Sequence, residues 1–382
     1  MLAKLSNKII ETMNNKIKLC YIGNVASHYR KSIFLLMDEA FDCDWVFGDS
    51  LGDIKQMDTS DLKGGVDKVK NINLFGGKAY WQKGVLKHLF RNNTHYLMIG
   101  DERCLSAWLL LMLSRLMPKK KVFLWTHGAY GKEGRLKRMV EWVFAKMSDG
   151  EFIYNNYSRN IMIGRGQNPE KLFTIHNSLD YENQLALRKL GLSSTVYEEH
   201  FGNKNHVLLF IGRLTKVKKL DQLIDAVRIL KEQGNNYNLV FVGDGTERLT
   251  LRERVVNCGL ESNVWFYGAC YDEKTNAELI YNADLCVAPG NVGLTAMHTM
   301  VFGTPVISHN NFPWQMPEFE AIHPGETGDF FVMDSVDSLA ETIKKWFATK
   351  TDRETIRRAC YHEIDSQWTP KYQMEVLKNH LI

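Results

Sequence analysis

Short runs of apolar, β-type residues alternate with helical patterns along almost the whole chain, and this alternation restricts the fold more than any other feature. Strands that are apolar throughout are buried on both faces, which is typical of a parallel sheet covered by helices on both sides. We therefore predict an α/β fold. In the first half of the chain the runs are Ile17 to Ile22, Trp45 to Phe47, Tyr96 to Ile99, Val122 to Trp125, Phe152 to Tyr154 and Leu172 to Ile175.

The same alternation starts a second time after a polar, charge-mixed stretch between Asn177 and Asn205. A chain of 382 residues is also too long for one ordinary core. We therefore predict two domains, with a helix near the end that packs back on the first. The runs of the second half are Val207 to Ile211, Leu239 to Val242, Val264 to Tyr267, Leu285 to Ala288 and Val306 to Ser308. The predicted segments are 1–180 for the first domain, 181–205 for the connection, 206–365 for the second domain and 366–382 for the terminal helix.

Composition favours a soluble protein of the reducing cytosol. The hydrophobic share is 45% and the charged share 24%, which excludes a disordered chain. The seven cysteines form no C-x-x-C pair, and several lie in apolar runs, which argues against a disulfide framework. Met1 to Asn15 lacks the apolar core of a secretory signal, and Leu105 to Met117 is shorter than the about 20 residues that a bilayer requires.

The net charge is only +4, yet basic residues crowd one segment of the first domain that holds few acids. Such a segment attracts anionic lipid or a phosphorylated acceptor, and the alternative is a solvated helix face. No motif of aromatic and basic residues accompanies it, so we expect no nucleic-acid partner. We expect a cytoplasmic protein with peripheral contact to the inner face of the cell membrane. The basic residues are Lys119, Lys120, Lys121, Lys132, Arg135, Lys137, Arg138 and Lys146.

Two cations follow the first strand of the second domain. Arg213 ends the run Phe210 to Leu214, and Lys218 comes five residues later at the start of a helix. Ligands of such folds lie outside the carboxyl ends of the strands, where these cations can bind a diphosphate and stabilise it as a leaving group. The alternative is a basic loop, because Lys216 and Lys219 make the whole turn rich in lysine.

Glycine-bearing turns follow two later strands. Gly243 and Asp244 form a tight turn that lets a backbone approach a ligand, although one such turn is weak support. The stretch Ala288 to Ile307 reads as strand, turn, short helix from near Gly293, and strand. The free amides at the start of that helix and the hydroxyl of Thr295 can bind the phosphates of a donor. His298, one turn later, is within reach of a ribose. The alternative is that His298 is a buried structural histidine.

Two segments of the first domain carry candidate residues. His127 ends the strand Val122 to Trp125 and is followed by glycines, so it can bond a sugar hydroxyl or move a proton. The turn after the first strand holds Asn24, and then His28, Tyr29 and Arg30, where an acceptor would enter. The alternative for these three is that they merely begin a helix.

Other constellations carry no prediction of chemistry. Asp42 and Asp44 have the D-x-D spacing of metal-dependent transferases, but we place them in a turn before Trp45 and expect no metal. The chain also lacks H-E-x-x-H, P-loop and G-x-S-x-G motifs, which excludes the zinc proteases, NTPases and serine hydrolases that depend on them.

The order of these motifs resembles glycosyltransferase family 4, the retaining GT-B enzymes of surface-polysaccharide and glycolipid assembly. The resemblance implies two Rossmann-like domains whose parallel sheets face a central cleft. It is strongest in Gly212 to Leu214 with Lys218, in Gly243 to Gly245, in Gly303 to Ile307 and in Gly325 to Gly328.

The resemblance also implies roles for residues. Arg213 and Lys218 would bind the diphosphate of a nucleotide-sugar donor without a metal or other cofactor, and His127 would face the transferred sugar. The remaining donor residues would be Gly243, Asp244, Tyr267 near the base, Asn291, Gly293, Leu294, Thr295 and His298, and the acceptor residues Asn24, His28, Tyr29 and Arg30. The acceptor would be a glycan, expected on a polyprenyl-diphosphate carrier.

One departure from the family stands out. The family usually carries two glutamates, of which the second falls on His298 here and the first on Gly290 or in a short deletion before Gly293. We expect Asn291 to make the contact with the donor sugar that the first glutamate makes in the family. The missing acids leave two alternatives to a transferase: a non-catalytic subunit that binds nucleotide sugars or glycans, and a GT-B nucleotide-sugar epimerase.

Overall fold

The computed structural model describes residues 16–49, 55–350 and 352–382, and Met1 to Asn15, read above for a secretory signal, lies outside them. The chain divides into two compact units. Unit 1 comprises Met1–Asp180 and Pro370–Ile382, and unit 2 comprises Tyr181–Thr369. Each unit is described separately below. Among the described residues no helix is both long enough and apolar enough to span a bilayer.

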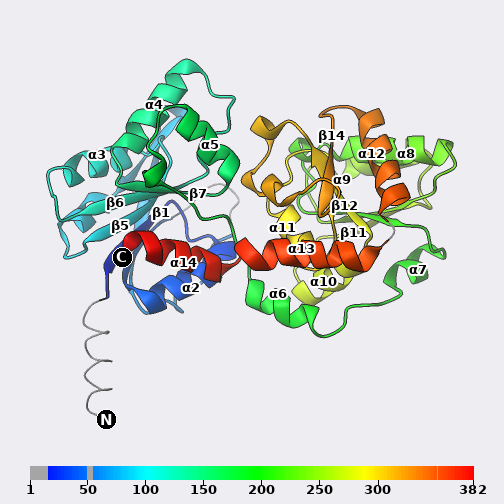
Figure 1. The fold of residues 1–382 in the computed structure, drawn as a ribbon, viewed down its shortest axis with the longest axis horizontal. Coiled ribbons are helices and arrows are strands. Elements are labelled where there is room, and N and C mark those ends of the chain that lie inside the picture. Colours follow the sequence, from blue (N-terminus) through cyan, green and yellow to red (C-terminus); the bar gives the residue numbers. More distant parts are fainter. Residues whose placement is uncertain (1–15, 50–54, 351) are drawn as a thin grey trace, which may run out of the picture. The chain divides into compact units, whose positions relative to one another are not determined.

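Unit 1 contains an eight-stranded sheet in the order β4-β3-β2-β1-β5-β6-β7-β8 (Figure 1). All its neighbouring strands are parallel except β3 and β4, which form an antiparallel pair. Its strands are β1 (Lys18–Gly23), β2 (Asp42–Gly48), β3 (Gly65–Leu74), β4 (Ala79–Lys83), β5 (His95–Ile99), β6 (Lys121–Thr126), β7 (Gly150–Ile153) and β8 (Leu172–Thr174).

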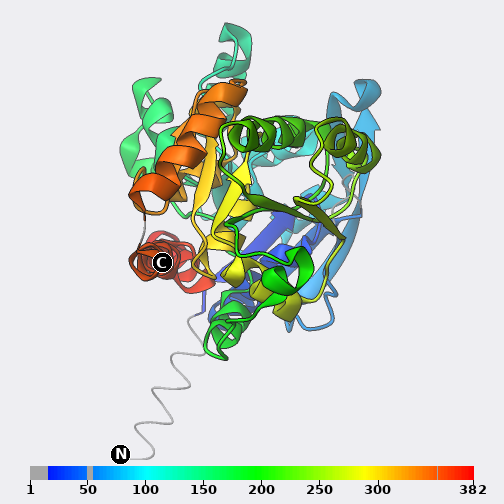
Figure 2. The same ribbon diagram turned by 90° about the vertical axis from the view of Figure 1, so that its right-hand side faces the viewer.

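Unit 2 contains a six-stranded, wholly parallel sheet in the order β11-β10-β9-β12-β13-β14. Counted within the unit this order is 3-2-1-4-5-6, the arrangement of a doubly wound Rossmann fold. Figure 2 shows α12 (orange) next to the strands of this unit, where it contacts β14 and α8. The strands are β9 (Val207–Ile211), β10 (Asn238–Val242), β11 (Val264–Gly268), β12 (Leu285–Ala288), β13 (Val306–His309) and β14 (Gly328–Phe331).

Helices cover the sheets of both units. In unit 1 they are α2 (Lys31–Ala40), α3 (Leu105–Ser114), α4 (Arg135–Lys146), α5 (Asn156–Gly164) and α14 (Pro370–Leu381). In unit 2 they are α6 (Tyr181–Arg188), α7 (Val196–Phe201), α8 (Leu220–Glu232), α9 (Arg248–Asn257), α10 (Glu273–Asn282), α11 (Thr295–Met300), α12 (Val336–Thr349) and α13 (Arg353–Gln367). The polar segment predicted as a connection thus holds α6 and α7, which belong to unit 2.

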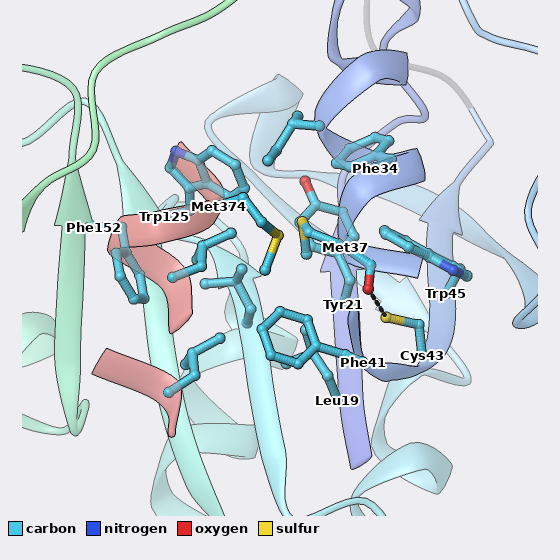
Figure 3. Packing of buried hydrophobic residues seen from close by; sticks show 14 of the residues in the cluster. Leu19, Tyr21, Phe34, Met37, Phe41, Cys43, Trp45, Trp125, Phe152 and Met374 are labelled. Carbon is cyan, nitrogen blue, oxygen red and sulfur yellow. Dashed lines mark hydrogen bonds between the residues drawn. The ribbon is translucent and has the colours of Figure 1, made fainter. Parts of the chain in front are cut away.

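The core of unit 1 has two layers, one on each face of its sheet. On one face, large side chains of the strands, such as Tyr21 and Trp45, pack against Phe34 and Met37 of α2 and Met374 of α14 (Figure 3). The other face packs against α3 and α4. Because the central strands β1, β5 and β6 are buried on both sides, their sequences are largely apolar, as predicted from the sequence.

Helix α14 belongs to unit 1 although it ends the chain. Its Gln373 accepts a hydrogen bond from Ser178 Oγ at 2.6 Å and donates one to the carbonyl of His176 at 2.8 Å. Met374, Leu377 and Leu381 are buried in the same core as α2. The last residues of the chain therefore complete the covering of the first sheet.

We predict that Leu377→Ala lowers the free energy of unfolding of unit 1 by about 2–5 kcal/mol, because Leu377 is fully buried and alanine would leave a cavity. The exposed Lys378 provides the control, since Lys378→Ala removes no buried contact. Urea unfolding of the two variants and the wild type measures the change. Equal stability of the two variants would show that α14 does not support this core.

Candidate active site

The carboxyl ends of β9 and β12 meet where the strand order of unit 2 reverses. In open α/β sheets ligands bind in the crevice at this switch point. Here Gly212 and Arg213 follow β9, and Pro289 to Asn291 follow β12. The sequence motifs singled out for a diphosphate therefore lie on one edge of the unit 2 sheet.

Lys218 joins the two loops at this edge. Its Nζ donates hydrogen bonds to the carbonyl and the side-chain Oδ1 of Asn291, at 2.7 and 2.8 Å. The carbonyl of Lys218 in turn accepts a bond from the amide of Gly290 at 3.0 Å. Burial lowers the pKa of Lys218 to about 8, with Glu318 opposing the shift and Arg213 adding to it. The site thus holds a desolvated cation whose present partners are neutral oxygens.

Arg213 is exposed at the end of β9 and acts electrostatically on Lys218, so the structure brings the two predicted cations together. Glu318, on the 3-10 turn Pro317–Ala321, is 2% exposed, and its negative charge acts on Lys218. No sequence signal points to Glu318, because it follows no strand and matches no motif. Only the folding of residues 312–321 against the β12 loop, through the bond from the Val292 amide to Gln315 at 2.9 Å, brings it near.

Glycines let the loops of this edge pack backbone to backbone. A Cβ on Gly243 would lie 1.9 Å from the carbonyl oxygen of Gly212, and one on Gly290 would lie 2.0 Å from that of Val217. Asp244 points away from this contact and pairs with Arg248 at 2.9 Å. Because no side chain fits at position 290, the place on which the first family glutamate would fall cannot hold an acid in this loop.

Helix α11 begins at Thr295, two residues later than the predicted start near Gly293, and has six residues. Leu294 is its N-cap, and Gly293 has a φ of 55°, which glycine adopts easily. The Thr295 hydroxyl donates to the carbonyl of Ile211 at 3.0 Å, which holds the helix start against the end of β9. In this state the proton of the Thr295 hydroxyl is therefore donated to the backbone of the protein and is not available to a ligand.

His298 has a carboxylate partner that the sequence analysis missed. Its Nε2 lies 3.0 Å from Oε1 of Glu273, which also accepts a bond from Gln184 Nε2 at 2.8 Å. Burial raises the pKa of Glu273, but the bonds from His298 and Gln184 lower it by more, so the net shift is downward. Glu273 starts α10, and no sequence spacing connects it with His298. A carboxylate is thus present where the family's second glutamate is absent.

Tyr267 lies on β11, at the far edge of the sheet from β14, with its ring 5.1 Å from that of Trp265. Burial raises its pKa, so its hydroxyl is neutral. The sheet places it two strands from β9. Of the predicted donor residues it is the one that stands apart from the switch point.

Unit 1 contains a cavity of 470 Å³ at the carboxyl ends of its central strands. Asn24, Tyr29, Arg30 and His127 all line it, so the structure brings together four predicted residues from two distant segments. His28 is not among the lining residues, and its Nδ1 instead lies 3.2 Å from the carbonyl of Lys55 on the exposed surface. The cavity therefore combines aromatic rings with charged groups.

Arg30 is buried at the base of this cavity. Its guanidinium donates to the hydroxyls of Tyr21, at 3.1 Å, and Tyr154, and lies over the Trp125 ring at 4.8 Å. Among the described residues, neither Arg30 Nε nor Trp125 Nε1 has a hydrogen-bond partner. Two fully buried donors are therefore unpaired in this state, which costs free energy in the folded protein.

His127 is a neutral imidazole in this site. Its Nδ1 lies 2.9 Å from the hydroxyl of Tyr130, and its ring meets that of Tyr154 edge-on at 5.0 Å. Burial and then the positive charge of Arg30 lower the pKa of His127 to about 4. At neutral pH the ring can therefore both donate and accept a hydrogen bond.

Three carboxylates of the cavity were not predicted, namely Asp101, Glu102 and Glu141. Asp101 pairs with Arg103 at 2.8 Å, while burial and then Glu133 raise the pKa of Glu141 to about 7. Asp101 directly follows Gly100 at the end of β5, a position that the strand pattern could have revealed.

The D-x-D pair was placed wrongly in a turn. Asp42 and Asp44 lie in β2, at its start, and Asp44 accepts a bond from Asn93 at 2.7 Å. The start of a parallel strand is the edge opposite to the ligand edge. In the described part of the chain no group of three or more His, Cys, Asp or Glu residues could hold a metal ion.

Comparison with known proteins agrees with this geometry. Residues 197–362 match the family described as "Glycosyl transferases group 1". The chain is 32% identical over 154 residues to the putative glycosyltransferase EpsD of Bacillus subtilis (strain 168), which covers 39% of each chain. It is 31% identical over 113 residues to the GDP-mannose-dependent alpha-(1-6)-phosphatidylinositol dimannoside mannosyltransferase of Mycobacterium tuberculosis (strain ATCC 25177 / H37Ra), covering 28% of this chain and 29% of that protein. The chain thus matches well under half the length of these relatives.

Among solved structures, Anabaena HepE in complex with UDP superposes with a TM-score of 0.69 and 16% identity, over 96% of this chain and 99% of that chain. This likeness confirms the predicted fold class of two Rossmann-like domains, which is that of the GT-B glycosyltransferases. The predicted enzyme class, a glycosyltransferase, is confirmed at the level of the domain in residues 197–362.

We predict that His127 titrates with a midpoint near pH 4 instead of its ordinary 6.5. Because the unfolded chain takes up this proton first, the stability that His127 contributes is lost as the pH falls from 6.5 towards 4. The midpoint is measured by NMR titration of protein that carries isotope-labelled histidine, and the variant His127→Asn assigns the signal of His127. A midpoint close to 6.5 would contradict the neutral imidazole that the cavity imposes.

Proposed function

We propose that the protein is a retaining glycosyltransferase of the family 4 type, which moves a sugar from a nucleotide diphosphate sugar to a glycan acceptor in surface-polysaccharide synthesis. One observation carries the proposal. A half-buried lysine and an exposed arginine lie together at the switch point of unit 2, the position at which open α/β sheets bind their ligands.

The two cations suit the diphosphate of the donor. Lys218 is charged but desolvated, and its oxygen partners on Asn291 are neutral, so an anion would be a stronger partner. Arg213 adds planar donors that match phosphate oxygens. In this proposal they neutralise the charge that develops on the leaving diphosphate, which is the work that a divalent metal performs in other transferases. HepE, which was crystallised with UDP, has the same fold.

Glu273 and Glu318 take over from the missing family glutamates in this proposal. The His298 and Glu273 pair offers a donor and an acceptor for the hydroxyls of a ribose. Glu318 balances the charge of Lys218 near the turn of Gly290 to Gly293 and places a carboxylate near the donor sugar. Gly243, Asp244 and the loop of Gly293 to Thr295 remain donor contacts of this proposal, as does Tyr267 at the base.

The acceptor sugar occupies the unit 1 cavity in this proposal. The side chains that line the cavity, Arg30 and the carboxylates among them, contact its hydroxyls in this proposal, and neutral His127 orients the transferred sugar. The acceptor oxygen forms a bond to the anomeric carbon while the bond from that carbon to the diphosphate breaks. A phosphate oxygen of the leaving group takes the acceptor proton, and departure and attack on the same face retain the configuration.

We further propose a lipid-linked acceptor, such as a glycan on polyprenyl diphosphate, and contact of unit 1 with the cytoplasmic face of the membrane. The mycobacterial relative is named a phosphatidylinositol dimannoside mannosyltransferase. Its name thus includes a glycolipid, which supports a lipid-linked acceptor in this proposal. The excess of basic residues between positions 112 and 147 supplies the attraction to anionic lipid.

We predict that Arg213→Ala lowers kcat/KM at least about 100-fold, because the diphosphate loses a charge-assisted contact in the transition state. The fold should persist, since Arg213 is exposed. Lys216→Ala, in the same basic turn, provides the control and should stay within about twofold of wild type. Sugar transfer is assayed with a panel of nucleotide sugars and glycan acceptors.

The same assay separates the alternatives. Near-normal activity of Arg213→Ala would remove the diphosphate assignment. Binding of nucleotide sugars without turnover would indicate a binding subunit, and conversion of the donor without an acceptor would indicate an epimerase.

We predict that kcat/KM for the donor falls above about pH 8, by roughly tenfold per pH unit, because Lys218 loses its charge there in the free enzyme. In Lys218→Arg the side chain stays charged, so this alkaline limb should disappear whatever the residual rate. A wild-type profile that stays level from pH 7 to about 10 would contradict the role of Lys218.

A further inference from the structure

Helix α4 of unit 1 exposes apolar side chains on its outer face. Every residue from Arg135 to Met139 is exposed, which is unusual for a helix that covers a sheet. Leu136 is 71% exposed, Met139 57% and Val143 39%. Their spacing of three and four residues places all three on one face of α4.

The end of α3 extends this apolar surface. Met112 and Leu116, at and just after the end of α3, are 50% and 79% exposed. Arg115, between them in sequence, donates to the carbonyls of Lys146 and Ser148, at 3.1 and 3.0 Å, and so joins the ends of α3 and α4. We name the five exposed apolar residues the α3–α4 patch: Met112, Leu116, Leu136, Met139 and Val143.

Positive charge surrounds the α3–α4 patch, and negative charge is turned inward. The only acids between positions 112 and 147 are Glu133 and Glu141, whose side chains are 3% and 23% exposed and which both pair with Arg165. The cations are outside: Arg135 and Lys146 are exposed beside the apolar stripe of α4, and Arg115 is 44% exposed and pairs with Asp149 at 3.5 Å. The outward face is therefore apolar and cationic at once.

We propose that the α3–α4 patch docks unit 1 on a bilayer surface that contains anionic lipid. Leucine and methionine side chains enter the boundary between headgroups and acyl chains, while arginine and lysine meet the lipid phosphates. This deepens the proposed function, since it names the surface through which a lipid-linked acceptor would be met. A bilayer is favoured over a protein partner because the patch combines exposed apolar residues with an excess of exposed cations, among which Arg135 and Lys146 flank the apolar stripe of α4.

Flotation of the purified full chain with lipid vesicles tests the proposal without any substrate. The probes are vesicles of phosphatidylcholine alone and of phosphatidylcholine with phosphatidylglycerol. Wild type should float with the anionic vesicles and detach at high salt. Arg135→Gln with Lys146→Gln should weaken binding roughly 25-fold, and Leu136→Gln with Met139→Gln about tenfold or more.

The matched control replaces two leucines of similar exposure in unit 2, Leu190→Gln with Leu249→Gln, and should bind as wild type does. Wild type that stays in solution with anionic vesicles would overturn the proposal, as would equal losses in the control and the α4 variants. Light scattering tests whether a second copy of the chain occupies the α3–α4 patch instead. The proposal would also be overturned if the protein forms a dimer that the double variant Leu136→Gln with Met139→Gln abolishes while its vesicle binding stays unchanged. None of these readouts requires sugar transfer, so a failed transferase assay leaves them interpretable.

Discussion

The contact of Lys218 with Asn291 is the interaction on which the rest of the donor edge depends. It ties the loop after β9 to the loop after β12 across the point where the strand order reverses. The glycines at positions 243 and 290 permit the tight backbone packing that holds the ammonium there. An ammonium half removed from water, facing neutral oxygens, favours any anion that can replace them. The phosphate site that we propose is thus preformed by the geometry of the second sheet.

The two units handle charge in different ways. The edge of unit 2 presents cations, with Glu318 buried behind them. The cavity of unit 1 keeps its histidine neutral and mixes aromatic rings with a buried guanidinium and carboxylates. The first arrangement suits a diphosphate and the second suits sugar hydroxyls, so the division of labour that we propose follows from the electrostatics of each unit by itself.

The fold class could be predicted because burial on both faces makes the central strands apolar throughout. The same reasoning missed β3, β4 and β14. Most residues of β3 are exposed or half-buried, and polar residues such as Lys68, Lys70 and Asn71 break up its sequence, so no apolar run marks it. Helices α6 and α7 were missed for a related reason. They bury few residues, such as Gln184 and Tyr197, so their polar segment shows no clear helical pattern of apolar residues.

The position of candidate residues in loops that follow a strand could also be predicted, because the carboxyl ends of parallel strands share one edge. Arg213, Asn291 and His127 illustrate this. Glu273, Glu318 and Glu141 could not, because each lies on a helix or turn that only the folded chain brings to the site. The D-x-D pair shows the opposite error: its spacing resembles a metal site, but β2 places it at the wrong end of the sheet.

A crystal structure of the protein with bound UDP tests the central claim most directly. The account predicts that the diphosphate oxygens lie within about 3 Å of the Arg213 guanidinium and of Lys218 Nζ, at the end of β9. A diphosphate bound elsewhere, with Lys218 still held by Asn291, would contradict it.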